Sequence, residues 1–139
     1  MSVKDFVQQR RDALIAMRRD FHMYPEPAWL EYRSAAKVAD TLISLGYDVA
    51  LGADVLDLDS RMGLPSDEVM KAAMDRAIKE GANPELVEKM GYGKTAIVAT
   101  MKFGGEGPVV AFRVDMDSND VIEAKEDNHV PTKGGFRSC

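Results

Sequence analysis

The stretch PVVAFRVDM at residues 108–116 decides the fold that we expect for this chain. Its apolar side chains follow one another almost without interruption, which is typical of a strand buried on both faces and therefore central in an α/β sheet. Upstream, β-branched residues alternate with smaller ones over residues 95–103, and glycines within residues 104–107 supply turn chemistry. The sequence therefore predicts two strands joined by a hairpin, within an α/β fold of helices packed on a partial mixed β-sheet.

Two amphipathic helices are predicted in the first third of the chain. Ser2 and Asp5 offer a capping-box start, after which apolar residues recur at helical spacing until Pro25 stops the pattern. A second helix is expected at about residues 31–45, because Gly46 is placed to adopt the left-handed conformation after a helix end.

The middle of the chain is expected to be mainly helical after one short strand. Residues 47–51 have the length and the valine and tyrosine content of that strand. Ser66 begins a third helical pattern that ends before Gly81, and Asn83 caps a short fourth helix. The last twenty residues are predicted to be a polar loop.

Composition and charge exclude several classes of protein. The 139 residues are 45% hydrophobic and 29% charged, which is ordinary for one globular domain or part of one. A net charge of -5 without a long basic run argues against nucleic-acid binding. Apolar runs are too short for a membrane span, and the only cysteine is Cys139, so we expect a reducing, cytoplasmic location.

The sharpest candidate for chemistry is the pair Asp115 and Asp117 at the carboxyl end of the predicted central strand. Residues i and i+2 of a strand project from the same face, so both carboxylates would point into one small volume. They could hold a divalent cation or orient its imidazole ligands. A solvated junction between strand and loop explains the same pattern, because Asp is common in turns. Both interpretations stay open on the residues alone.

The other candidate residues have simpler interpretations. His22 lies beside aromatic residues at the end of the first helix, where a lone histidine is more often packed or hydrogen-bonded than catalytic. His129 has no second histidine or internal cysteine at ligand spacing. Trp29 is interpreted as a staple for the turn between the first two helices.

Three segments taken together resemble the zinc-dependent amidohydrolases of the aminoacylase and carboxypeptidase type. They are RRDFHMYPEPAWLEYRSA at residues 18–35, LGYDV at residues 45–49 and AFRVDMD at residues 111–117. The resemblance implies a catalytic α/β domain interrupted by a lid or dimerisation domain, with two divalent metal ions, zinc or manganese. The family's Cys, His and Glu ligands are expected beyond Cys139. Residues 1–139 are therefore interpreted as the first part of an incomplete catalytic domain, without the metal-ligand region and the lid.

By the same resemblance, Asp115 and Asp117 lie at the edge of the metal site and support it without direct ligation. Four residues match the family's amino-terminal signature, with an implied role that is structural or peripheral to the site: His22, Pro25, Glu26 and Glu31. No residue of this chain is assigned as a metal ligand or as catalytic. After Asp117 the family usually continues with Ala-Leu, whereas this chain has Ser118 and Asn119.

The function that the resemblance implies is metal-dependent hydrolysis of a small amide, p-aminobenzoyl-glutamate or a related N-acyl amino acid. We expect the isolated chain to bind no metal and to be inactive, because it lacks the family's ligand set. The alternatives are a non-catalytic truncated product and an interaction module that pairs with a separately encoded remainder. A homo-oligomer or hetero-oligomer is compatible with the resemblance, whereas nucleic-acid and membrane partners are not expected.

Overall fold

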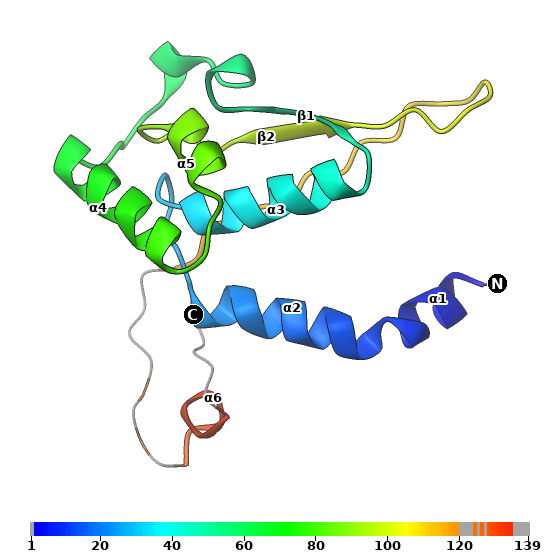
Figure 1. Cartoon of the computed structure of the whole chain (residues 1–139), viewed down its shortest axis with the longest axis horizontal. Helices are drawn as coiled ribbons and strands as arrows, with labels where there is room; N and C mark the ends of the chain where they lie inside the picture. Colours follow the sequence, from blue (N-terminus) through cyan, green and yellow to red (C-terminus); the bar gives the residue numbers. More distant parts are fainter. Residues whose placement is uncertain (1, 120–123, 125, 127, 135–139) are drawn as a thin grey trace. The chain divides into compact units, whose positions relative to one another are not determined.

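A computed structural model of the chain describes residues 2–119, 124, 126 and 128–134. The chain divides into two compact units (Figure 1). The terminal unit comprises Met1–Pro25 and Ser118–Cys139, and the central unit comprises Glu26–Asp117. Across the part that the structure describes, none of the helices combines the length and the apolar character needed to cross a lipid bilayer.

The terminal unit begins with two helices where the periodicity predicts one. Helix α1 spans Val3–Gln9 and helix α2 spans Arg11–Met23. The predicted capping box is present, because the Ser2 hydroxyl accepts from the backbone N–H of Asp5 and the Asp5 carboxylate accepts from the backbone N–H of Ser2. The backbone leaves the helical conformation at Arg10, whose guanidinium lies 3.6 Å from the centroid of the Phe6 ring. Hydrophobic spacing does not detect this break, because one non-helical residue barely changes the position of the apolar stripe.

The end of the chain also departs from the prediction of a loop. A single helical turn, α6, spans Val130–Lys133. The backbone N–H of Lys133 donates to the carbonyl of His129, and that of Gly134 donates to the carbonyl of Val130. One turn is too short to produce a periodic pattern, so the sequence carries no signal for it.

The central unit is built around helix α3, which spans Tyr32–Ser44 as predicted. The buried residues of α3 include three alanines, Ala35, Ala36 and Ala39, whose small side chains let the neighbouring elements approach closely. Gly46 has a φ of +86° and ends the helix in the left-handed conformation that the sequence indicates. The buried hydrophobic core consists of Leu30, Tyr32, Ala35, Ala36, Ala39, Leu51, Met70, Ala73, Ala77, Ala82, Val87 and Met90.

Helix α3 packs against two strands and two further helices. Strand β1, Asp48–Leu51, pairs antiparallel with strand β2, Ile97–Thr100, in a register that places Leu51 opposite Ile97. Helix α4, Asp67–Lys79, is capped by Ser66, and helix α5, Pro84–Met90, is capped by Asn83, both as predicted. Two short 3₁₀ turns, Gly52–Asp54 and Leu58–Ser60, follow β1. The fold class is therefore α/β, as expected.

The predicted central strand and its hairpin are absent from the described structure. Residues 109–114 form no strand, and β2 pairs with β1 instead of with the segment that follows it. Val109 is 97% exposed and Phe112 is 91% exposed. A continuous apolar run becomes a central strand only when strands flank it and helices cover it. The described residues supply neither for this segment, and this is the physical reason for the difference.

Candidate functional site

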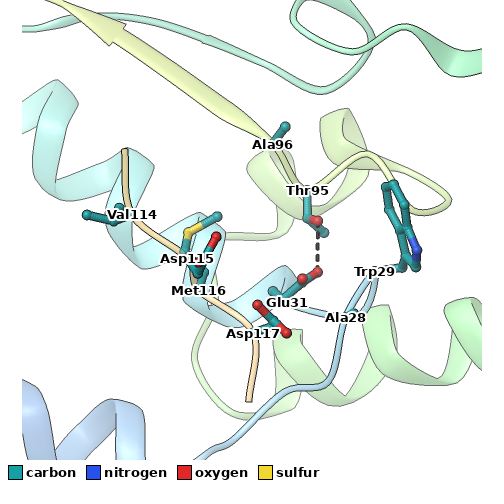
Figure 2. Close-up of a pocket in the computed structure, with 9 residues that line it drawn as sticks. All are labelled: Ala28, Trp29, Glu31, Thr95, Ala96, Val114, Asp115, Met116 and Asp117. Carbon is teal, nitrogen blue, oxygen red and sulfur yellow. Dashed lines mark hydrogen bonds between the residues drawn. The ribbon is translucent and has the colours of Figure 1, made fainter. Parts of the chain in front are cut away.

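Three segments of the central unit line one pocket of about 330 Å³ (Figure 2). They are the turn before α3, the two residues that precede β2, and residues 114–117. Five of the lining residues are apolar or aromatic, one is a threonine and three are acidic. They are Ala28, Trp29, Glu31, Thr95, Ala96, Val114, Asp115, Met116 and Asp117. Because all three charged residues are carboxylates, the pocket favours cations or hydrogen-bond donors over anions.

Glu31 and Thr95 join two walls of this pocket. The buried Thr95 hydroxyl donates a hydrogen bond of 2.9 Å to Oε2 of Glu31. Glu31 occupies the N-cap position of α3, but its side chain makes no capping hydrogen bond. In the view of Figure 2 its carboxylate projects between Thr95 and Asp117. The Glu31 carboxylate therefore faces the pocket instead of the helix that it precedes.

Glu26 supplies the cap that Glu31 leaves open. Its side chain is buried, and its two carboxylate oxygens accept from the backbone N–H groups of Arg33 at 2.9 Å and Ser34 at 2.7 Å. The Arg76 guanidinium lies 3.8 Å from Oε1. Burial raises the pKa of the Glu26 carboxyl, while the hydrogen bonds from Arg33 and Ser34 and the Arg76 charge act in the opposite direction. A negative charge at this helix N-terminus is also favoured by the helix dipole.

Trp29 lines the pocket and has an unusual backbone conformation. Its φ is +67°, which is rare for a bulky residue. The indole N–H donates a 3.0 Å hydrogen bond to the carbonyl of Met62, 33 residues along the chain. The interpretation of Trp29 as a staple between the first two helices is therefore incomplete, because this hydrogen bond ties the turn before α3 to the loop that precedes α4.

Asp115 and Asp117 line the same pocket although they do not lie on a strand. The side chain of Asp115 forms an exposed ion pair with Arg113 at 2.7 Å, an interaction that contributes little to stability in water. Asp117 is exposed, and Met116 between them packs against the hydrophobic core. Met116 thus connects the segment that carries the two carboxylates to the core.

Comparison with known proteins identifies the group to which these segments belong. No family model matches the chain. It is 44% identical over 138 residues to the A subunit of p-aminobenzoyl-glutamate hydrolase from Escherichia coli (strain K12), covering 99% of this chain and 32% of that protein. It is 42% identical over 137 residues to indole-3-acetyl-aspartic acid hydrolase of Enterobacter agglomerans, covering 99% of this chain and 31% of that protein.

A solved structure agrees with these relatives. The aminobenzoyl-glutamate utilization protein from Klebsiella pneumoniae superposes with a TM-score of 0.82 at 45% identity, over 86% of this chain and 30% of that one. The chain is homologous to part of the aminobenzoyl-glutamate hydrolase A subunits. It spans about a third of the length of the relatives that it matches.

The structure places the signature residues of this hydrolase family in different environments. Glu26 is buried at the start of α3, and Glu31 lines the pocket. His22 lies in the last turn of α2 in the terminal unit, with Nδ1 3.4 Å from the Arg18 guanidinium. Pro25 is the last residue of the first segment of that unit, two residues after α2 ends. The roles predicted for these four residues and for the aspartate pair stay predictions. Cys139 lies outside the described residues.

The divalent metals that this family implies do not fit the described residues alone. Among residues 2–119, 124, 126 and 128–134, no three His, Cys, Asp or Glu side chains are grouped as metal ligands. Asp115 is committed to Arg113, and Glu31 to Thr95. Within the described residues, the pocket is a wall that carries three carboxylates.

Thr95 is part of the site although its sequence context does not single it out. The pattern indicates only that Thr95 is the first residue of a strand, yet its hydroxyl is the partner of Glu31. No sequence pattern could have found it, because the hydrogen bond joins residues that lie 64 positions apart.

Proposed function

We propose that this chain forms part of a cytoplasmic, metal-dependent amidohydrolase. Its substrate would be p-aminobenzoyl-glutamate or a related N-acyl amino acid, cleaved to aminobenzoate or another acyl acid and to glutamate or another amino acid. The observation that carries the proposal is the identity of 44% and 42%, over nearly the whole chain, to two hydrolases. The substrates in their names are both amides that join an aromatic acyl group to an acidic amino acid.

The contribution of this chain would be the carboxylate wall of the site. Three features support that assignment: the shared pocket of Glu31, Asp115 and Asp117, the buried hydroxyl of Thr95, and the anchoring of residues 115–117 by Met116. We propose that Asp115 and Asp117 support metal ligands that come from polypeptide outside the described residues. Carboxylates in such positions orient ligating imidazoles through hydrogen bonds.

The assembly of the complete enzyme is part of the same proposal. Two of the relatives are named as an A subunit or its homologue, which supports the expectation that the enzyme works with a second type of polypeptide. A small-molecule amide would be the substrate, and the metals would be zinc or manganese.

A chimera tests the proposal directly. This chain replaces the matching segment of the Escherichia coli relative, and release of p-aminobenzoate from p-aminobenzoyl-glutamate is followed with added zinc or manganese. We expect metal-dependent release from the chimera and none from the isolated chain. Two substrates are tested, p-aminobenzoyl-glutamate and indole-3-acetyl-aspartate. The proposed activity is rejected if a folded, metal-loaded chimera hydrolyses neither of them.

Substitution of Asp117 tests the role of the carboxylate wall. Asp117→Asn in the chimera is expected to lower kcat or metal affinity about 10–100-fold, the range found for groups that orient metal ligands. Asp54→Asn is the matched control, because Asp54 is an exposed carboxylate outside the pocket. Equal effects of the two substitutions would contradict the assigned role.

A further inference from the structure

The pocket of the central unit has an aromatic ring in its wall as well as carboxylates. Trp29 lines the pocket and is only partly buried, so part of its ring is open to a bound group. In the view of Figure 2 the indole lies on one side of Thr95, and residues 114–117 lie on the other. A partly exposed aromatic ring in the wall of a cavity is a surface on which a second aromatic ring can stack.

The orientation of this ring is set before any ligand binds. The indole N–H donates a 3.0 Å hydrogen bond to the carbonyl of Met62, in the loop before α4. A side chain that is already held loses little conformational freedom when a ligand stacks on it, and this favours binding. The same hydrogen bond uses the polar group of the indole, so the ring offers the pocket an apolar contact.

Glu31 places a hydrogen-bond acceptor in the same pocket. Its oxygen Oε2 accepts from the buried Thr95 hydroxyl at 2.9 Å. Among the described residues, no donor bonds to the other oxygen, Oε1. Oε1 is therefore the atom of Glu31 that is available to a donor on a ligand.

The charge and the size of the pocket decide which end of an N-acyl amino acid fits it. Its three charged lining residues are acidic, and none of the described lining residues is basic. The carboxylates of an acidic amino acid would therefore be repelled. The volume of about 330 Å³ is at the small end of the range for ligand sites, about 300–1,000 Å³. The pocket thus suits one uncharged, ring-sized part of a substrate.

The acyl groups of the proposed substrates have the matching chemistry. The two relatives are named for p-aminobenzoyl and indole-acetyl conjugates, and each of these acyl groups is an aromatic ring system with an N–H donor. Neither acyl group carries a negative charge. A ring can stack on an indole, and an N–H group donates a strong hydrogen bond to an ionised carboxylate.

We propose that Trp29 and Glu31 form the subsite for the aromatic acyl group. The acyl ring stacks on the indole of Trp29, and its N–H donor binds Oε1 of Glu31. These two residues thereby determine specificity, while Thr95 and the carbonyl of Met62 act as positioning groups. The inference rests on the proposed function for its class of substrate, but its first test requires no hydrolysis.

Nuclear magnetic resonance of the full chain tests the subsite without metal or activity. Trp29 is the only tryptophan, so its indole N–H gives a single resonance. We expect 4-aminobenzamide to shift this resonance saturably, with a Kd at least about tenfold below that of 4-nitrobenzamide, because a nitro group has no donor for Oε1. N-acetyl-glutamate represents the acidic end of the substrate and is expected to leave the resonance unchanged.

Substitution of Glu31 assigns this preference to its carboxylate. Glu31→Gln keeps the size of the side chain and an oxygen that can accept from Thr95, but presents an amide N–H to the ligand. The preference for the amino compound over the nitro compound should therefore disappear. Asp54→Asn removes an exposed carboxylate outside the pocket and should retain the preference.

Kinetics in the chimera provide a second, independent measurement. Trp29→Leu is expected to raise KM for p-aminobenzoyl-glutamate about 2–10-fold with little change in kcat, because it removes binding by stacking. Trp29→Phe keeps a ring and should recover most of the loss. Phe103→Leu is the matched control, because Phe103 is 74% exposed and does not line the pocket, and it should leave KM unchanged.

Several results would overturn the inference. They are equal Kd values for the amino and nitro compounds, a larger shift with N-acetyl-glutamate, no shift with any compound, and equal KM values for Trp29→Leu and Phe103→Leu. The proposed function fails separately. If 4-aminobenzamide binds as expected but a folded chimera hydrolyses neither substrate, the subsite stands and the proposed function falls. If the chimera is active without these preferences, the proposed function stands and the subsite falls.

Discussion

Replacing Glu26 by alanine removes the carboxylate that caps the amino terminus of α3. The carboxylate of Glu26 accepts two backbone N–H groups, from Arg33 at 2.9 Å and from Ser34 at 2.7 Å, and its side chain is fully buried. In Glu26→Ala both donors lose their acceptor, and the Arg76 guanidinium loses the nearby charge. The substitution therefore tests whether Glu26 is part of the framework of the central unit.

The expected cost follows from the two orphaned donors. A buried donor left without a partner costs about 1–3 kcal/mol, so two donors cost about 2–6 kcal/mol. Loss of the favourable charge at the helix N-terminus adds roughly 0.3–1 kcal/mol. Relief of the unfavourable burial of a carboxylate offsets part of this total, since burial is the largest influence on the Glu26 pKa. We expect a net loss on the order of 3 kcal/mol in the free energy of unfolding.

Urea unfolding followed by the fluorescence of Trp29 measures this loss. Trp29 is the only tryptophan, so its signal reports the central unit alone. With an m-value of about 1–3 kcal/mol per molar urea, the midpoint should fall by roughly 1–3 M. Glu88→Ala removes an exposed glutamate from α5 and should change the free energy of unfolding by no more than about 0.5 kcal/mol. If the two variants unfold at the same midpoint, the capping role of Glu26 is refuted.

Three further predictions concern the same unit. Gly93→Ala should lower the free energy of unfolding by about 1–3 kcal/mol in urea titrations, because φ is +62° and the new Cβ would lie 2.7 Å from Cδ2 of Leu64; Gly104→Ala, with open space around it, should not. Tyr32→Phe should cost about 1–3 kcal/mol by the same assay, because the buried hydroxyl accepts the N–H of Gly93 at 2.8 Å. Burial raises the pKa of Glu26 above 4.5 in the folded state, so the folded chain holds this proton at higher pH than the unfolded chain does. The stability of the wild type relative to Glu26→Gln should therefore be highest below about pH 4.5 and fall as the pH rises through the raised pKa; a difference that stays flat or rises with pH would contradict this.

The helices of the central unit could be predicted because their signals are local. Ser66 and Asn83 each cap a helix through their own side chains, and Gly46 follows α3 with the φ that its position requires. These features depend on residues within one turn of each other, so a sequence pattern contains them completely. The break at Arg10 has no comparable signal, because it changes one backbone conformation without changing the spacing of apolar residues.

The prediction of a central strand is wrong because the stability of such a strand is not local. A run such as residues 109–114 is neutral between strand and extended loop until neighbouring strands accept its backbone hydrogen bonds. The described residues place β1 beside β2 and leave the following run unpaired. The fold class survives this error because α3, α4 and α5 still pack with the β1 and β2 pair around one core.

The sequence indicates that the two aspartates share one site, but the reason for this expectation, a strand, is absent from the described structure. The alternation of a strand is the reason for expecting Asp115 and Asp117 in one volume, yet they line one pocket without a strand. Packing of Met116 against the core achieves what the strand was expected to do. Thr95 and Glu31 come together from residues 64 positions apart, a contact that no spacing rule could indicate.

Glu26 and Glu31 have two different roles at the start of α3. Glu26 caps the helix, and Glu31 accepts the hydrogen bond from Thr95 in the pocket. The start of α3 needs an acceptor for its free backbone N–H groups, and the residue at the N-cap position would normally supply it. Here Glu26 reaches forward to those groups from five residues before the N-cap, so Glu31 at the N-cap is released to bind Thr95 in the pocket. Loss of Glu26 would give Glu31 an alternative partner in the uncapped helix and draw its carboxylate away from the pocket. In the chimera, Glu26→Ala should therefore impair the site more than its effect on stability alone predicts. Thr95→Val should reproduce the part of that effect that is due to Glu31, without the loss of the cap.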